Sequence, residues 1–349
     1  MPSYLLKRIE SLIKYTSDIE IFVAEFCEYS NLYTVQRNRI KELIPEQRFW
    51  TINTLSNHTV ENSMKVIDII KSNSIDIVHV DEMIEGFDSF NKVPNELKNA
   101  LYNNDRTWRV VETCHNIWFD PNTSKQFHPD AYALCTPYHL QNTFKEMPSH
   151  KEVFEFPIEN NFRSREEQIK SQEILGLDST KIHIINVGLW TSGKNQGEGI
   201  EIARHFQDRN VEFHFVGNQA SNFESYWGPL MSNLPPNVHI WGERNDVETF
   251  MKASDILMFN STWECNPLVI REAASLGLKI IARDLPQYVG MFKGLITPLS
   301  DEISNNVGLL RKLISSTRDY QILNGMTEEF TEKHYNLYKF LLTQEPIKT

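Results

Sequence analysis

The stretch "DILMFNSTWECNPLVIREAASLG" (residues 255–277) joins an apolar strand to a helix, with an acid on each side of the junction. Its first residues are bulky and apolar, which is typical of a strand buried on both faces. Asn266 suits the N-cap of the helix, and Pro267 suits its first turn. Glu264 precedes the helix and Glu272 lies within it. Two acids in these places fit either a solvated helix or a ligand site. The rest of the sequence is needed to distinguish these two interpretations.

The composition indicates a folded protein with room for two domains. The chain has 349 residues, of which 23% are charged and 40% hydrophobic. The formal net charge of -11 argues against a general polyanion-binding surface, so nucleic acid is not an expected partner. Apolar runs are too short to span a membrane, and the first residues do not resemble a secretory signal. The cysteine spacing fits neither a metal site nor a disulfide framework, and we expect a cytoplasmic protein.

Strand and helix patterns alternate along the whole chain. In the first half, helical spacing occurs at 4–15 and 66–73, and strands are predicted at 19–26, 75–82, 108–116 and 131–137. In the second half, strands are predicted at 181–188, 211–218, 238–243, 255–260 and 278–283. This alternation predicts an α/β protein with parallel sheets covered by helices on both faces.

A polar stretch at 160–175 interrupts the pattern, and we expect the linker between two domains there. The predicted domains are 1–165 and 166–330. A final helix within 331–349 shows helical spacing of apolar residues, and we expect it to pack back on the first domain.

Predicted strands of the second half end in glycine at Gly188, Gly217 and Gly242, and Asn218 follows the second of these. Glycine lets a ligand approach the backbone closely, and ligands of α/β proteins bind at the carboxyl ends of parallel strands. Turns also use glycine for their own geometry. Three such strand ends nevertheless favour a ligand surface.

The segment "GLWTSGKN" (188–195) fits most of a phosphate-loop pattern. A nucleotide triphosphatase needs Ser or Thr after the lysine to hold magnesium, and Asn195 stands there instead. Asp255 opens its strand, whereas the magnesium-binding aspartate should close one. The pattern therefore excludes a triphosphatase and leaves Lys194 as either a phosphate-facing cation or a solvated lysine.

The helix start supplies a second anion-binding feature. Free backbone amides at its first turn, from Asn266 to Leu268, form an anion site without a basic side chain. Glu272 can accept hydrogen bonds from two hydroxyls of a ribose, and Glu264 can reach a group beyond the phosphate. Together with Lys194, this arrangement predicts a site for a sugar nucleotide.

The segments "VGLWTSGKNQGEGIEIAR", "FHFVGN" and "HIWGERNDVETFMKASDILMFNSTWECNPLVIREAASLGLKIIA" resemble the carboxy-terminal domain of GT-B glycosyltransferases, specifically the retaining family 4. The resemblance covers residues 181–290. It implies two Rossmann-like domains whose parallel sheets face each other across a cleft. It also implies metal-independent transfer of a sugar, with retention, from a nucleotide-diphosphate sugar. The acceptor would be a glycan, a lipid-linked sugar or another hydroxyl compound, and no cofactor is expected.

The same resemblance implies roles for individual residues. Glu272 would hold the ribose, Glu264 would face the donor sugar, and Lys194 would meet the diphosphate. In the first half, "VVETCHN" resembles the strand that ends in the active-site histidine, here His115. His115, Glu264 and Lys194 are thus the expected catalytic residues. Read without the resemblance, His115 is more simply a structural histidine at a strand end.

Three departures from the family pattern bear on function. Leu189 stands where the family usually has an arginine, and Arg244 is the candidate for the lost charge. Cys265 replaces a small glycine. The family begins with a strand and a glycine-rich loop, whereas this sequence begins at the first helix, so the first domain is expected to lack its first strand.

Two other functions stay open at this point: a sugar-nucleotide epimerase of similar fold and a catalytically impaired nucleotide-sugar-binding subunit. The helix at 4–15 carries Lys7, Arg8 and Lys14 beside an apolar face. This face fits either peripheral contact with the cytoplasmic face of a membrane or packing on the sheet.

Overall fold

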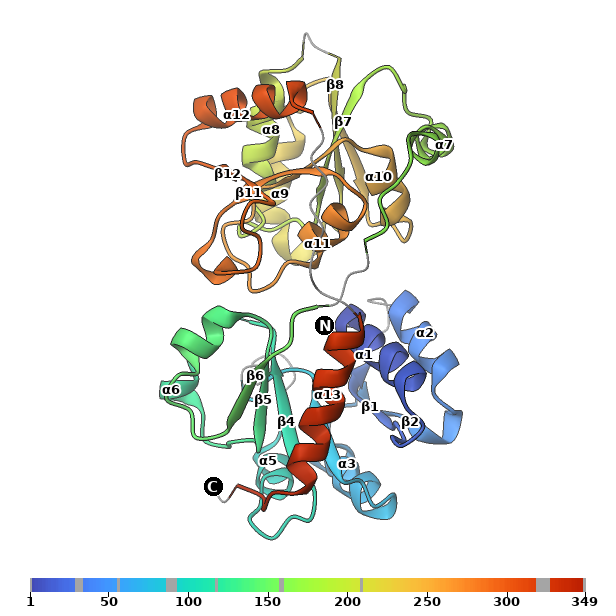
Figure 1. The fold of residues 1–349 in the computed structure, drawn as a ribbon, viewed down its shortest axis with the longest axis vertical. Helices are drawn as coiled ribbons and strands as arrows, with labels where there is room; N and C mark the ends of the chain where they lie inside the picture. Colours follow the sequence, from blue (N-terminus) through green and yellow to red (C-terminus); the bar gives the residue numbers. More distant parts are fainter. Residues whose placement is uncertain are drawn as a thin grey trace. The chain divides into compact units, whose positions relative to one another are not determined.

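The computed structural model divides into two compact units, which are described separately (Figure 1). Unit 1 comprises Met1–Pro157 and Gly325–Thr349, and unit 2 comprises Ile158–Asn324. The structure describes residues 2–28, 34–54, 57–85, 93–116, 119–156, 160–207, 210–317 and 327–347.

The polar stretch at 160–175 forms helix α7 (Arg165–Leu175), so the linker predicted there is wrong. Ser164 caps the helix by accepting a hydrogen bond from the Glu167 amide, and the Glu167 carboxylate accepts one from the Ser164 amide. This capping box stabilises a helix that has few apolar residues. Arg163 also donates to a backbone carbonyl of unit 2, which explains why unit 2 begins a few residues before the expected boundary.

Unit 2 contains a 6-stranded parallel sheet in the order β12-β11-β10-β7-β8-β9, with helices on both faces. Its strands are β7 (Ile182–Val187), β8 (Val211–Val216), β9 (Val238–Gly242), β10 (Ile256–Phe259), β11 (Lys279–Arg283) and β12 (Thr297–Leu299). Besides α7, its helices are α8 (Gln196–Arg204), α9 (Glu224–Met231), α10 (Val247–Ala253), α11 (Leu268–Ser275) and α12 (Ile303–Ser315).

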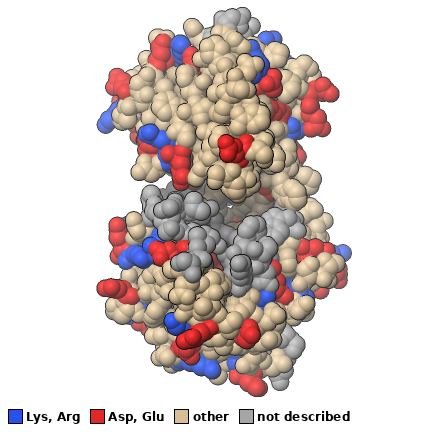
Figure 2. Space-filling model, turned by 180° about the vertical axis from the view of Figure 1, so that it is seen from behind, with Lys and Arg blue, Asp and Glu red and all other residues tan. Residues whose placement is uncertain are grey.

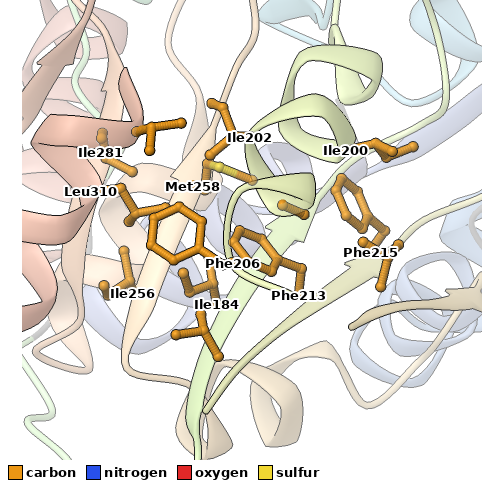
Figure 3. Close-up of a cluster of buried hydrophobic side chains, with 14 of the residues drawn as sticks. Ile184, Ile200, Ile202, Phe206, Phe213, Phe215, Ile256, Met258, Ile281 and Leu310 are labelled. Carbon is orange, nitrogen blue, oxygen red and sulfur yellow. The ribbon is translucent and has the colours of Figure 1, made fainter. Parts of the chain in front are cut away.

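Large apolar side chains fill the space between this sheet and helices α8 and α12 (Figure 3). Phe213 and Phe215 of β8 lie on the same face because side chains two residues apart along a strand point the same way. Phe206 and Leu310 reach them from the helical side. A second cluster on the other face includes residues of α10 and α11, so both faces of the sheet are covered.

Unit 1 contains a 2-stranded parallel sheet, β1-β2, and a 4-stranded parallel sheet, β3-β4-β5-β6. Its strands are β1 (Val23–Glu28), β2 (Phe49–Thr54), β3 (Ile77–Val80), β4 (Arg109–Cys114), β5 (Ala131–Leu134) and β6 (His150–Val153). Its helices are α1 (Pro2–Tyr15), α2 (Thr34–Leu43), α3 (Val60–Ser72), α5 (Asn95–Leu101), α6 (Pro121–Ser124) and α13 (Thr327–Leu342). Helices α1 and α13 lie side by side (Figure 1).

Of the basic residues of helix α1, Arg8 does not face solvent, whereas Lys14 is exposed. Arg8 is only 5% exposed, and its Nη1 lies 2.9 Å from His79 Nε2 and 3.0 Å from Asp81 Oδ1. A guanidinium buried in this way cannot contact a membrane surface. No helix in the described part of the chain is long and apolar enough to cross a membrane.

Acidic and basic side chains are interspersed over the described part of the face shown in Figure 2. On this face the charged side chains do not gather in one patch of a single sign. Buried apolar side chains of unit 2 gather instead in the two clusters beneath its helices.

Replacing Gly217 with alanine is expected to destabilise unit 2. A Cβ at this position would lie 1.9 Å from the carbonyl oxygen of Gly188, so the backbone would have to shift. Overpacking of this kind costs about 1–3 kcal/mol, which should lower the urea midpoint of unfolding. The control is Gly308→Ala in α12, where a Cβ meets nothing within 4 Å and alanine favours the helix. Equal midpoints for the two variants would contradict the expectation.

Acid is expected to destabilise unit 1 through its buried histidines. Burial lowers the pKa of His139 to about 4 and the pKa of His334 well below its usual range. In the unfolded chain an imidazole takes up its proton near pH ~6.5. The unfolded state therefore binds more protons as the pH falls through this value, and the free energy of unfolding decreases. For His139 alone, the loss should reach about 2 kcal/mol at pH ~5.

Urea unfolding at pH ~7 and pH ~5 measures this loss. The variant His139→Leu should lose less stability between the two values than the unaltered chain. His205→Leu, which replaces an exposed histidine of unit 2, should leave the pH dependence of unit 1 unchanged. A pH dependence of His139→Leu as steep as that of the unaltered chain would show that another group is responsible.

Candidate functional site

The three predicted glycines lie next to one another at the carboxyl ends of β7, β8 and β9. The amide of Gly217 donates to the Gly242 carbonyl at 2.7 Å, and the amide of Gly188 donates to the Val216 carbonyl at 3.0 Å. The Gly188 position also faces the stem of Lys194, since a Cβ there would lie 3.7 Å from Lys194 Cδ. The strand ends and the lysine thus form one continuous surface.

Lys194 and Glu264 are paired, although 70 residues separate them in the sequence. The Lys194 ammonium forms an ion pair with Glu264 Oε1 and lies 5.2 Å from the centre of the Phe259 ring. Ser261 donates to the same Glu264 oxygen at 2.6 Å. The cation and the acid expected at the site are therefore held together and oriented before any ligand binds.

Hydrogen bonds between two loops fix this pair. The Thr262 amide donates to the Gly193 carbonyl at 2.8 Å, and Ser261 Oγ lies 3.0 Å from the same carbonyl oxygen. Sequence analysis did not identify Ser261. Its position two residues after the end of β10 was the available signal, because such positions line α/β sites.

The start of α11 differs in detail from the prediction. Pro267, not Asn266, is the N-cap residue, and no side chain caps the helix among the described residues. The Asn266 side chain instead accepts a hydrogen bond from Arg271 Nε at 3.1 Å. Because proline has no side-chain acceptor, the amides that begin at Leu268 stay available to an anion.

Glu272 projects from the exposed side of α11. Its side chain is exposed, whereas the neighbouring Ala273 and Ala274 are buried in the cluster beneath the helix. The acid therefore lies one turn from the helix start and can reach a ligand without leaving its position on the helix.

Asn218 and Arg244 are engaged with nearby acids. Asn218 Nδ2 donates to Glu243 Oε2 at 2.8 Å. Arg244 forms two hydrogen bonds with Asp246, both of 2.8 Å, and these bonds lower the pKa of the Asp246 carboxyl. The charge of Arg244 is therefore balanced within its own loop.

His115 belongs to unit 1, where it follows the carboxyl end of β4. Its Nδ1 lies 3.4 Å from Cys135 Sγ, and its ring packs edge-on against Tyr4 with a centroid distance of 4.8 Å. Its Nε2 has no hydrogen-bond partner among the described residues. Burial lowers the pKa of His115 well below its usual range, so the imidazole is neutral.

Glu82 is a second buried group beside His115 that sequence analysis did not single out. Its carboxyl accepts hydrogen bonds from Asn116 Nδ2 at 2.9 Å and from the Met83 amide at 3.1 Å. Burial raises the pKa of Glu82 to about 8, so it is protonated at neutral pH. The Glu82 carboxyl thus links, through these hydrogen bonds, the segments that follow β3 and β4. The sequence signal was an acid at a strand end, in "HVDE".

Comparison with known proteins connects this site to glycosyltransferases. The family model described as Glycosyl transferases group 1 matches residues 181–310. The UDP-Gal:alpha-D-GlcNAc-diphosphoundecaprenol alpha-1,3-galactosyltransferase of Escherichia coli is 28% identical over 182 residues, which are 51% of this chain. The match spans about half of that relative, 47% of its length.

Solved structures extend the likeness to nearly the whole chain. A glycosyltransferase from Rickettsia africae has a TM-score of 0.71 and 17% identity, and Anabaena HepE in complex with UDP and glucose has a TM-score of 0.72 and 13% identity. Each comparison covers 97% of this chain and 95% of the other. At such identities the likeness shows the fold. The chain therefore has the GT-B glycosyltransferase fold, and its unit 2 matches the group 1 glycosyl transferases.

Proposed function

We propose that the protein transfers a sugar from a nucleotide-diphosphate sugar to a hydroxyl acceptor. The observation that carries the proposal is the Lys194–Glu264 pair beside the uncapped start of α11, with Glu272 on the same helix. A cation, a helix start and two hydroxyl-accepting acids match a diphosphate flanked by a sugar and a ribose.

Each part of the donor has a proposed contact. Lys194 and the first amides of α11 bind the diphosphate, and Glu272 accepts hydrogen bonds from the ribose hydroxyls. Glu264 faces the donor sugar. Gly188, Gly217 and Gly242 allow the donor to lie against the backbone of the strand ends. Asn218 and Arg244 border the same surface.

We propose that transfer proceeds with retention and without a metal ion. The Lys194 ammonium and the α11 dipole stabilise the negative charge that develops on the departing diphosphate. The leaving phosphate then takes the proton of the acceptor hydroxyl, so no pair of opposed catalytic carboxylates is required. His115 is the proposed contact to the donor sugar, because a neutral imidazole can hydrogen-bond to a hydroxyl.

Two relatives support particular substrates. Anabaena HepE has been solved with UDP and with UDP-glucose, and the Escherichia coli relative is named for UDP-Gal and an undecaprenol-linked acceptor. A uridine diphosphate sugar and a lipid-linked acceptor are therefore the first substrates to test. With a lipid-linked acceptor, the protein would work at the cytoplasmic face of a membrane.

Replacing Glu272 with alanine is expected to remove most of the thermal stabilisation by UDP. A ligand at about 100 times its Kd stabilises a protein by about 2.7 kcal/mol, which raises Tm by several degrees. Without the carboxylate the ribose hydroxyls lose their acceptor, so this shift should shrink. The control is Glu201→Ala, which removes an exposed acid from α8 on the same unit. An unchanged shift in Glu272→Ala would refute the ribose assignment.

Labelled UDP-sugars without an acceptor distinguish the three candidate activities. Slow hydrolysis is expected of a transferase, an epimerised donor would show an epimerase, and binding without turnover would show an impaired subunit. With an acceptor, NMR of the product should show the anomeric configuration of the donor, and EDTA should leave the rate unchanged. Inversion, or loss of activity in EDTA, would overturn the proposed mechanism.

A further inference from the structure

The backbone takes an unusual conformation immediately after Lys194. Asn195 has φ 53° and ψ 43°, which is the left-handed region, and it is one of two non-glycine residues with positive φ in the described part of the chain. Residues other than glycine rarely adopt this conformation, because their Cβ approaches the following carbonyl oxygen. A residue that precedes a helix ordinarily has extended backbone instead. The conformation of Asn195 therefore has to be stabilised by its surroundings.

Glu198, in the first turn of α8, contacts both the side chain and the backbone of Asn195. Its Oε2 accepts a hydrogen bond from Asn195 Nδ2 at 2.7 Å, and its amide donates to the Asn195 carbonyl at 3.2 Å. The amides of Lys194 and Asn195 both donate to the Thr191 carbonyl at 3.1 Å. These bonds close a turn from which the stem of Lys194 extends to the Gly188 position.

Two further donors hold the Glu198 carboxylate in place. Arg283, the last residue of β11, donates from Nη2 to Oε2 at 2.8 Å, and Asn306 of α12 donates to Oε1 at 2.9 Å. Asn306 is itself fixed, because its Oδ1 accepts from the Ser300 amide at 2.8 Å. Both Glu198 and Asn306 are buried. Each oxygen of Glu198 thus meets donors, an arrangement that a carboxylate satisfies and an amide cannot.

The ion pair between Glu198 and Arg283 also joins α8 to β11, which is a structural role. An apolar pair would join a helix to a sheet equally well, since burying an ion pair adds little or nothing to stability. The donors around Glu198 are what require a carboxylate, and one of them belongs to Asn195, next to Lys194. The geometry therefore connects this buried charge to the candidate site.

We propose that Glu198 is a positioning residue for the sugar-nucleotide site. Glu198 keeps Asn195 in the left-handed conformation, and this conformation directs the stem of Lys194 along the strand ends to Glu264. The lysine is thereby fixed twice, through its backbone by Glu198 and through its ammonium by Glu264. The inference rests on the proposed function, because the ligand of Lys194 is the diphosphate proposed above.

Hydrogen exchange of the ligand-free chain tests the positioning. Glu198→Gln loses one acceptor oxygen, so we expect the amides of 194 and 195 to exchange about ten times faster. Asn195→Ala disfavours a positive φ and should have the same effect, whereas Asn195→Gly adopts this conformation freely and should stay protected. The double variant Glu198→Gln/Asn195→Gly should recover slow exchange.

This rescue by glycine separates positioning from a general structural role. If Glu198 only joined α8 to the sheet, glycine at 195 would recover nothing, and Asn195→Ala and Asn195→Gly would behave alike. Either result overturns the proposal. Asn195 is only partly buried, so its two variants decide the question even if Glu198→Gln does not fold. The matched control is Glu201→Gln, which alters an acid paired with Arg204 on the same helix and should leave exchange at 194 and 195 unchanged.

Titration with UDP measures the consequence for the ligand. Glu198→Gln and Lys194→Gln should each weaken UDP binding about ten-fold, and the combined variant should bind no more weakly than Lys194→Gln alone, because the carboxylate acts through the lysine. Losses that add independently would overturn the positioning role. If Lys194→Gln leaves UDP binding unchanged, the proposed diphosphate contact is wrong, whereas the exchange data still decide whether Glu198 fixes the turn.

Discussion

Parallel strands impose one constraint on this molecule: the inner strands must be paired on both edges, and both faces of the sheet must be covered. Unit 2 meets the constraint with one unbroken sheet. Neighbouring residues such as Ile184 and Ile185 point into different clusters, one beneath each layer of helices. The carboxyl ends of the strands are where pairing stops and backbone groups become available. The glycines, the Lys194–Glu264 pair and the start of α11 all lie in segments that follow such ends.

The same constraint is met less completely in unit 1. Among the described strands, β1 pairs only with β2 and β3 only with β4. A cavity of about 640 Å³ lies between β1 and β3, and its lining includes Val23, Phe26 and Val78.

The sequence predicted the inner strands of both units because burial on both faces produces long apolar runs. It missed β2, β6 and β12, each of which is at the edge of its sheet and is short or polar. It also misread α7 as a linker, because the helix has few apolar residues and depends on its capping box. The motif Ser164 to Glu167 was the signal that could have corrected this. The hydrophobic pattern of the sequence thus predicts buried strands well, but it does not reveal a helix that depends on local hydrogen bonds.

The sequence also predicted only part of the candidate site. Glycine spacing and residue type were sufficient to single out Lys194 and Glu264, but their pairing depends on how two distant loops meet at the Gly193 carbonyl. The pairing changes what the lysine can do. An ammonium has three donors, so Lys194 can keep its bond to Glu264 and still meet a phosphate. In the proposed donor complex, Glu264 would hold the cation in place for the diphosphate, and its other oxygen would accept from a sugar hydroxyl. Under that proposal, loss of Glu264 would disturb the position of the cation as well as the contact to the sugar.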